Sequence, residues 1–253
     1  MFLAIDIGNT NITFGLLQSG HAVAEARIAT STRRTIDELR WLLRNFLNEN
    51  HALTGVSAAG IASVVFSVTP SVERAVAALL PEIRCDVVGK TIKPEIEISY
   101  DPPTAVGIDR LCNVIAGMKR WGAPLIVVDF GTATTVDVVD SKGVYIGGAI
   151  APGIETSLHA LATHAAQLYS ISLELPEQAI GKNTADSMRS GLLWGAISAV
   201  DGLALRFAIE IGGAPHIVAT GGLAPMLAPH SKIITEIVPS LVLEGIEIIC
   251  HKA

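Results

Sequence analysis

Residues 2–14 read FLAIDIGNTNITF and residues 125–138 read LIVVDFGTATTVDV, so one short pattern occurs in each half of the chain. Aligned on Asp6 and Asp129, each copy is an apolar run ending in aspartate, a glycine two residues later, small polar residues and a second apolar run. Two β-type runs around such a turn predict a β-hairpin.

The tight loop of each hairpin suits a phosphate group. Its main-chain N–H groups can bind an anion, and its aspartate can hold a cation or the waters of one. Glycine, asparagine and threonine are also common in ordinary turns. A single copy of the pattern would therefore favour an ordinary hairpin that binds no ligand. Because the pattern opens both halves of the chain, we predict two phosphate-binding loops.

Composition limits the class of protein. The 253 residues are 50% hydrophobic and 17% charged, which predicts a folded chain with one large or two modest domains. The net charge of −6 argues against a nucleic-acid-binding surface. Three cysteines without a C-x-x-C pair fit a reducing compartment. We expect a cytoplasmic protein without a signal peptide or a membrane partner, because no apolar run reaches about 18 residues.

Each half reads as three β-type runs followed by alternating helices and strands, which predicts a duplicated α/β architecture. Thr35 and Glu38 predict a capping box at a helix start, and Thr69 before Pro70 predicts another N-cap. A long helix is expected from Thr184 to about Ile211. Glycine and proline interrupt the pattern near residue 120. We therefore predict domains 1–120 and 121–253, with ligands at the strand ends.

Four motifs stand out along the chain: Asp6-Ile-Gly-Asn-Thr-Asn, Gly107-Ile-Asp-Arg, Asp129-Phe-Gly-Thr-Ala-Thr-Thr and Gly147-Gly-Ala-Ile-Ala-Pro-Gly. Together they resemble the type III pantothenate kinases, within the superfamily of actin, sugar kinases and Hsp70 ATPases. The resemblance covers residues 2 to about 225, and the usual form of the second motif has alanine where Ile108 stands. It implies an α/β fold of two duplicated actin-like (ribonuclease H-like) domains with a nucleotide cleft between them.

The same resemblance implies that the chain phosphorylates the primary hydroxyl of pantothenate with ATP, the first step of coenzyme A synthesis. It implies magnesium with ATP near Asp6 and a potassium or ammonium ion at Asp129. Cations suit a site where two aspartates would otherwise repel the triphosphate. The implied ATP-binding residues are Asp6, Ile7, Gly8, Asn9, Thr10, Asn11, Ile12, Thr13 and Thr132.

For pantothenate, the resemblance makes Asp109 the base that takes the hydroxyl proton and Arg110 the partner of the substrate carboxylate. An aspartate at a helix start is often only a cap or dipole partner, and Thr184 has an equal alternative as a helix N-cap. The family implies a homodimer with the substrate pocket at the interface. The implied substrate-binding residues are Tyr100, Gly107, Ile108, Asp109, Arg110 and Thr184.

Other chemistries have little support in the sequence. It contains no G-x-x-x-x-G-K-[ST], no protein-kinase motif set, no H-E-x-x-H and no G-x-S-x-G. A phosphohydrolase on the same fold would need no arginine for an organic acid, and a silent regulatory homologue could have lost its aspartates. The turn at Gly221-Gly222 is either an adenosine loop, as in the superfamily, or a plain strand-to-helix turn.

Overall fold

The computed structural model describes residues 1–165 and 168–251, and these form two compact units. Unit 1 comprises Met1–Ile96, Asp101–Ala116 and the segment from Ser240 onward, and unit 2 comprises Glu97–Tyr100 and Gly117–Pro239. The units are thus not the contiguous domains 1–120 and 121–253 expected from the sequence. They differ because a short segment before residue 101 joins unit 2 and the last helix joins unit 1.

Unit 1 is built on a five-stranded mixed sheet in the order β3-β2-β1-β4-β5. The first hairpin and β3 pair antiparallel, whereas β4 and β5 pair parallel to β1. The register places Asp6 opposite Thr13 on one side and Ala62 on the other. The strands are β1 (Phe2–Ile7), β2 (Asn11–Gln18), β3 (His21–Ala29), β4 (Ala58–Ser63) and β5 (Arg84–Val87).

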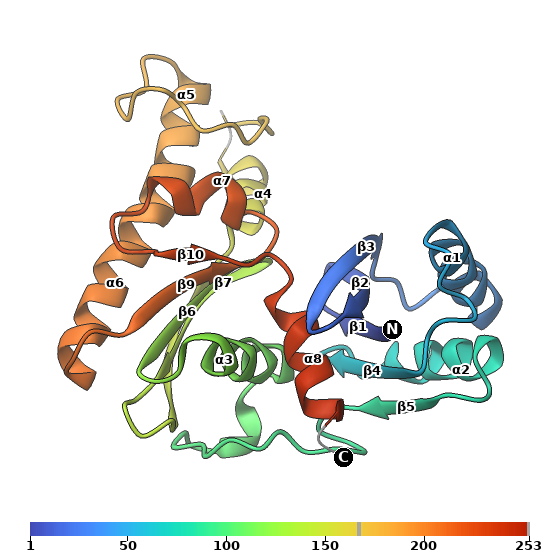
Figure 1. The fold of residues 1–253 in the computed structure, drawn as a ribbon. Helices are drawn as coiled ribbons and strands as arrows, with labels where there is room; N and C mark the ends of the chain where they lie inside the picture. Colours follow the sequence, from blue (N-terminus) through green and yellow to red (C-terminus); the bar gives the residue numbers. More distant parts are fainter. Residues whose placement is uncertain (166–167, 252–253) are drawn as a thin grey trace. The chain divides into compact units, whose positions relative to one another are not determined.

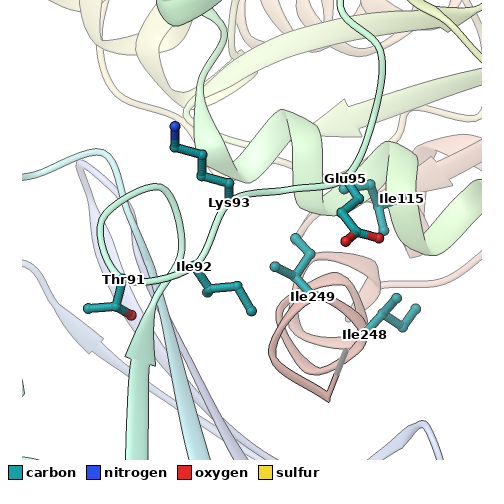
Figure 2. A pocket seen from close by; sticks show the side chains of 7 residues that line it. All are labelled: Thr91, Ile92, Lys93, Glu95, Ile115, Ile248 and Ile249. Atoms are coloured by element: carbon teal, nitrogen blue, oxygen red, sulfur yellow. The ribbon is translucent and has the colours of Figure 1, made fainter. Parts of the chain in front are cut away.

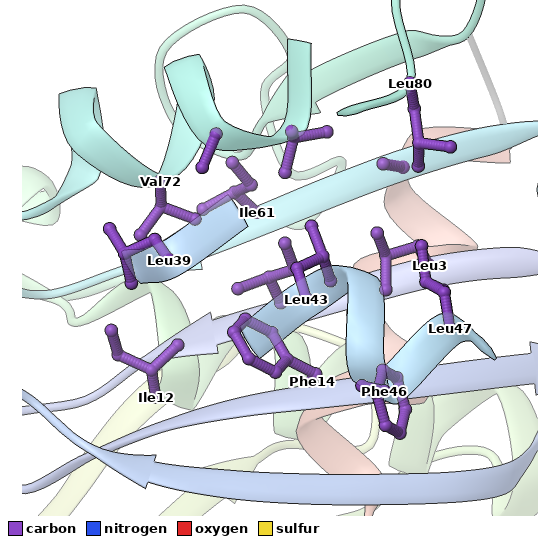
Figure 3. Close-up of a cluster of buried hydrophobic side chains, with 14 of the residues drawn as sticks. Leu3, Ile12, Phe14, Leu39, Leu43, Phe46, Leu47, Ile61, Val72 and Leu80 are labelled. Carbon is purple, nitrogen blue, oxygen red and sulfur yellow. The ribbon is translucent and has the colours of Figure 1, made fainter. Parts of the chain in front are cut away.

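Helices cover both faces of this sheet (Figure 1). α1 (Ile36–Glu49) and α2 (Thr69–Leu79) pack over one face, and α8 (Leu241–His251) packs against β1 and β4. Apolar side chains of β1, β2, β4, α1 and α2 form one buried cluster (Figure 3). Burial of this apolar surface is the main stabilising term for unit 1. The remaining helical elements of the unit are η1 (Pro103–Ala105) and the first part of α3 (Ile108–Trp121).

The sheet of unit 2 repeats that of unit 1 strand for strand. Its order is β8-β7-β6-β9-β10, with an antiparallel β6–β7–β8 meander and parallel β9 and β10. Asp129 lies opposite Thr135 and Thr220, the positions equivalent to those beside Asp6. The strands are β6 (Leu125–Phe130), β7 (Ala133–Val139), β8 (Tyr145–Pro152), β9 (His216–Thr220) and β10 (Glu236–Ile237).

This repetition confirms the predicted fold class, an α/β chain of two duplicated actin-like domains. The second strand of each hairpin also has an irregularity in its pairing with the third strand. The register shifts between Leu16 and Leu17 on β2 and between Val138 and Val139 on β7. Such bulges bend and twist a strand. The nucleotide cleft stays a prediction.

The helices of unit 2 pack a second apolar cluster against its sheet. The long helix predicted from Thr184 is confirmed as a helical stretch, but it contains a π-helical turn, η2 (Ser190–Trp194). π-Turns inside α-helices occur often at functional sites. The other helices are α4 (Ile154–His164), α5 (Thr184–Arg189), α6 (Gly195–Ile211), α7 (Ala224–Leu227) and η3 (Ala228–His230).

The two predicted helix caps have different outcomes. The capping box at α1 is confirmed, because Thr35 Oγ1 accepts from Glu38 N and Glu38 Oε2 accepts from Thr35 N. The N-cap predicted at Thr69 is wrong. Thr69 is the first residue of α2, and its hydroxyl donates to the main-chain oxygen of Val65 and to Ser63 Oγ.

One helical stretch, Thr184–Ile211, is long and apolar enough to cross a membrane by length and composition alone. The most apolar 18 consecutive residues of this stretch have a mean hydropathy of 1.5, and 28% of them are buried. The buried face includes Leu193, Ile197 and Val200, which pack in the unit 2 cluster. The stretch therefore serves as a core helix of unit 2 that leaves an apolar face uncovered.

Candidate active site

The first aspartate loop joins β1 to β2 and is held in shape by main-chain bonds. Gly8 N donates to Asn11 O at 3.0 Å, and Thr30, just beyond β3, donates its hydroxyl to Gly8 O at 2.6 Å and its N–H to Thr10 O at 2.8 Å. Asn9, Thr10 and Asn11 are exposed, and Asp6 and Gly8 are half-buried. The conformation of the loop is thus supported by hydrogen bonds within the protein.

Not every residue predicted to bind ATP presents its side chain to solvent. Ile7 and Ile12 are fully buried in the unit 1 cluster, and Thr13 is 8% exposed. Any contact that these three residues make with a nucleotide therefore uses the main chain. The side chains available at the turn are those of Asn9, Thr10 and Asn11.

The second loop has the same kind of brace. Gly131 N donates to Ala133 O at 3.1 Å, and Thr132 O accepts from Gly153 N at 3.1 Å and from Thr156 Oγ1 at 2.8 Å. Gly153 stands so close that an added Cβ would overlap the carbonyl oxygens of Gly131 and Thr132. Thr132 itself is exposed. In both units the segment after the third strand therefore fixes the phosphate loop.

Asp129 lies in a recess formed by glycines. A Cβ on Gly131 would lie 3.3 Å from Asp129 Oδ1, and a Cβ on Gly221 would overlap the same oxygen. Gly221 has φ of +92°, a left-handed conformation that glycine adopts at little cost. The turn after β9 thus has two reasons to contain glycine at this position, its backbone angle and the neighbouring carboxylate.

Asp109 and Arg110 are the second and third residues of α3, which begins at Ile108. Asp109 is half-buried, its Oδ1 accepts from Arg110 N at 2.8 Å, and a Cβ on Gly107 would overlap that oxygen. Arg110 is 7% exposed, so its guanidinium lies inside the protein. The carboxylate at the start of α3 is held in one orientation by the main chain around it.

Cys112 shows that Asp6 and Asp109 lie in the same region of unit 1. Burial raises the pKa of the Cys112 thiol well above its ordinary value, and the carboxylates of Asp6 and Asp109 raise it further. The thiol is fully buried, and both carboxylates belong to the same unit as the thiol. The aspartate of the first loop and the predicted base, which are far apart in the sequence, therefore both lie in the part of unit 1 around Cys112.

Tyr100 belongs to unit 2, whereas Gly107, Ile108, Asp109 and Arg110 belong to unit 1. The ring of Tyr100 lies 6.2 Å from the ring of Tyr145, and its edge contacts the position where Gly147 lacks a side chain. Ile108 packs on the turn at Gly89. The predicted substrate residues thus divide between the two units.

Thr184 is exposed and is the first residue of α5. The alternative reading of Thr184 as the N-cap is wrong, because Asn183 caps the helix by accepting from Asp186 N at 2.9 Å. Thr184 lines a cavity of about 370 Å³ together with apolar residues of α4, α5 and η2. Its hydroxyl is therefore not used as the cap, and Thr184 is one of the residues that line this mainly apolar cavity.

A separate cavity of about 350 Å³ lies in unit 1 (Figure 2). Ile115 of α3 and Ile248 and Ile249 of α8 form its apolar side, and Lys93 points away from them. None of the predicted site residues lines this cavity.

Metal binding at the candidate site depends on single carboxylates. Within residues 1–165 and 168–251, no group of three or more His, Cys, Asp or Glu side chains is placed to hold a metal ion. Magnesium that arrives with ATP needs only one or two protein carboxylates, because phosphate oxygens and water supply the rest. Asp6 offers one such carboxylate, and the absence of side chains at Gly131 and Gly221 makes space for the Asp129 carboxylate itself.

Three supports of these loops are not among the residues that the sequence predicts for the site. Thr30 and Thr156 brace the two phosphate loops, and Gly221 makes room for Asp129. The signal for Gly221 is its place in a glycine pair directly after a strand. The two threonines carry no local signal, because each contacts a loop more than 20 residues away in the sequence.

The family model described as "Type III pantothenate kinase" matches residues 2–206. A relative named type III pantothenate kinase from Parafrankia sp. (strain EAN1pec) is 39% identical over 252 residues, which are 100% of this chain and 98% of that protein. One of the same name from Anaeromyxobacter sp. (strain K) is 42% identical over 250 residues, 98% of each chain.

A solved structure supports the fold independently. A conserved protein of Campylobacter jejuni, described as a Baf family transcriptional activator, has a TM-score of 0.62 and 18% sequence identity to this chain. The match covers 99% of this chain and 98% of the other. At this identity the likeness concerns the fold alone.

Proposed function

Because the chain belongs to the type III pantothenate kinase family, we propose that it is an ATP-dependent pantothenate kinase. It transfers the γ-phosphoryl group of ATP to the primary hydroxyl of pantothenate and so catalyses the first step of coenzyme A synthesis. The observation that carries the proposal is the match of about 40% identity over the whole chain to proteins of that name. The paired aspartate loops provide the chemistry that phosphoryl transfer requires.

ATP binds through both loops. Residues 6–13 follow the phosphates with the main chain and the exposed polar side chains of the turn, and Thr132 adds a contact from the second loop. The braces described above support this assignment, because a preordered loop loses little entropy when it binds. Asp6 would hold magnesium, which neutralises charge on the phosphates when it is bound.

Asp129 would hold a potassium or ammonium ion. The donor set fits such an ion, since one half-buried carboxylate beside main-chain carbonyls offers oxygen ligands with a single negative charge. An ion there offsets the repulsion between the carboxylate and a triphosphate. The glycines at positions 131 and 221 keep the recess open.

Asp109 acts as the general base. The oxygen of the primary hydroxyl attacks the γ-phosphorus, the bond from that phosphorus to the β–γ bridging oxygen breaks, and the hydroxyl proton passes to the Asp109 carboxylate. The products are ADP and 4'-phosphopantothenate. The bond from Arg110 N and the recess beside Gly107 support this role, because they fix the orientation of the carboxylate before the reaction.

The organic substrate binds to residues on either side of the Pro-rich segment. Arg110 pairs with the carboxylate of pantothenate, which a planar guanidinium binds with two parallel hydrogen bonds. Tyr100, Gly107, Ile108 and Thr184 complete the contacts. The cavity at Thr184 offers an apolar wall beside a hydroxyl, which suits a ligand with a branched alkyl group and amide oxygens.

A second copy of the chain covers the open face of α5, η2 and α6. The exposed residues Gly191, Gly195 and Gly202 would each accept a Cβ without meeting any atom within 4 Å, whereas Leu205 and Ile209 are 51% and 81% exposed. Small residues at spacings of three and four on a helix allow another helix to approach closely. We therefore place the homodimer contact at this face, on the helical stretch that begins at Thr184.

The dimer is tested by Gly202→Leu, with Glu210→Leu as the matched control on the same helix. Light scattering after gel filtration should give twice the chain mass for the parent and the control, and a single chain mass for Gly202→Leu. A dimer that persists in Gly202→Leu would remove this face from the interface. Because a partner chain covers the apolar face, the protein stays soluble in the cytoplasm without a membrane.

The activity is tested by a coupled assay of ADP release, with and without pantothenate and with and without potassium. A kinase releases ADP only when pantothenate is present and releases it faster with potassium. ADP release at equal rates with and without pantothenate would instead show a phosphohydrolase. No ADP release under any of these conditions would show a catalytically silent homologue.

A further inference from the structure

Asp137 and Tyr145 form a buried polar pair that the proposed reaction does not use. Both residues have no solvent exposure, and the Tyr145 hydroxyl donates to Asp137 Oδ1 at 2.8 Å. Thr135 donates its hydroxyl to Asp137 Oδ2 at 2.9 Å. Burial of a carboxylate is costly unless hydrogen bonds satisfy its oxygens. This pair therefore fixes the Tyr145 ring firmly to β7.

The main chain of Tyr145 holds the segment that leads to the substrate residues. Tyr145 N donates to Glu97 O at 2.9 Å, and Ser99 N donates to Tyr145 O at 2.8 Å. Ile98 forms a parallel bridge with Tyr145. Residues 97–100 consequently pair with the start of β8, and for this reason they belong to unit 2 although the residues on both sides of them belong to unit 1.

Tyr100, at the end of this segment, lies on a surface that Tyr145 and Gly147 make together. The two tyrosine rings are 6.2 Å apart and inclined at 56°, within the range of favourable aromatic contacts. A Cβ on Gly147 would lie 3.4 and 3.5 Å from two ring carbons of Tyr100, so the ring occupies the space where a side chain would stand. Tyr145 thus touches Tyr100 through its ring and through the paired main chain.

We propose that Asp137 and Tyr145 are positioning residues that hold Tyr100 in place for pantothenate. The inference rests on the proposed function, in which Tyr100 contacts that substrate. The chain of contact runs from the Asp137 carboxylate to the Tyr145 hydroxyl, and from the Tyr145 ring and main chain to Tyr100. Neither Asp137 nor Tyr145 touches the reacting atoms in this scheme, so their loss weakens substrate binding and leaves the phosphoryl transfer step intact.

The test compares Tyr145→Phe with Tyr100→Ala and with the double variant in the steady-state assay. Tyr145→Phe keeps the ring and removes only the hydroxyl. We expect its KM for pantothenate to rise about tenfold, while kcat and the KM for ATP stay within about twofold. Ile126→Val, which trims the buried core of the same unit, is the control for a simple loss of stability.

A structural readout accompanies the kinetics. Hydrogen exchange of the Ser99 amide, which is bonded to Tyr145 O, should become faster in Tyr145→Phe and stay unchanged in Ile126→Val. In the double variant, the change at residue 145 should have no further effect on KM, because its influence passes through Tyr100.

The outcomes separate this inference from the proposed function. Parent protein without pantothenate-dependent ADP release would refute the proposed function. An unchanged KM in Tyr145→Phe, with a raised KM in Tyr100→Ala, would overturn the positioning role and leave the kinase assignment standing. The same would follow if Tyr145→Phe raised KM by an equal factor with and without Tyr100, or if Ile126→Val produced the same rise.

Discussion

The glycine recess around Asp129 permits a test in which two similar substitutions give different results. Gly221 and Gly122 both have left-handed φ angles, +92° and +78°. A Cβ at Gly122 would meet nothing within 4 Å, whereas one at Gly221 would overlap Asp129 Oδ1 and lie 2.7 Å from Phe130 O. Gly221→Ala and Gly122→Ala therefore share the cost of the backbone angle and differ in the contact with Asp129.

The shared cost is about 1–2 kcal/mol, the penalty of a Cβ in the left-handed region. In unit 2 this should lower the Tm of Gly122→Ala by roughly 2–8 °C, at about 2–4 °C per kcal/mol. The overlap in Gly221→Ala adds the cost of overpacking, about 1–3 kcal/mol, and a correspondingly larger loss of Tm. It also displaces the Asp129 carboxylate, and a misplacement of ~1 Å in an active site can cost about a hundredfold in rate.

The assay is pantothenate-dependent ADP release over a titration of potassium, with thermal unfolding of both variants. Gly221→Ala should need at least about tenfold more potassium for half-maximal rate and lose about a hundredfold in kcat/KM. Gly122→Ala should keep the potassium dependence of the parent. Equal potassium dependence in the two variants would refute the reasoning that Asp129 holds the ion in a recess kept open by Gly221.

Asp109→Asn should bind ATP and pantothenate in calorimetric titrations yet lose at least about a hundredfold in turnover, the usual share of a general base; full turnover would transfer that role to another group. Hydrogen bonds from the main chain and side chain of Thr35 lower the pKa of Glu38 below 4.5, so this carboxylate stabilises α1 above pH 4.5 and ceases to do so as pH falls through its folded pKa. Urea unfolding of the parent and Glu38→Gln should thus converge in acid, and a gap that persists there would contradict the capping role. Burial raises the pKa of the Cys85 and Cys250 thiols to about 12, so alkylation at pH 8 should be slow in the folded protein and fast in urea; equally fast alkylation in both would contradict their burial.

The two hairpins and the Asp-x-Gly turns that close them could be predicted because their signals are local. The alternation of apolar residues and the Asp-x-Gly turns specify each hairpin within about 15 residues, and the repetition in the second half points to a duplicated fold. The capping box at Thr35 also depends only on residues three positions apart. These features appear in the structure where the sequence placed them.

Features that depend on distant contacts could not be predicted. The place of α8 on the sheet of unit 1 is set by contacts such as Leu243 against Gly15 and Ile246 against Gly60, between opposite ends of the chain. The Thr69 hydroxyl bonds to Ser63 and Val65 because the preceding turn brings them near, although its sequence resembles an N-cap. The Asp137–Tyr145 pair forms only once β7 and β8 are in register.

The position of α8 has a consequence for synthesis on the ribosome. Unit 2 is continuous from Gly117 to Pro239, so it can pack while later residues are still inside the exit tunnel. In unit 1, the face of β1 and β4 that α8 covers stays exposed until residues 241–251 leave the ribosome. The sheet of unit 1 is translated first but completes its packing last. Deletion of α8 should therefore expose β1 and β4 to chaperones and proteases.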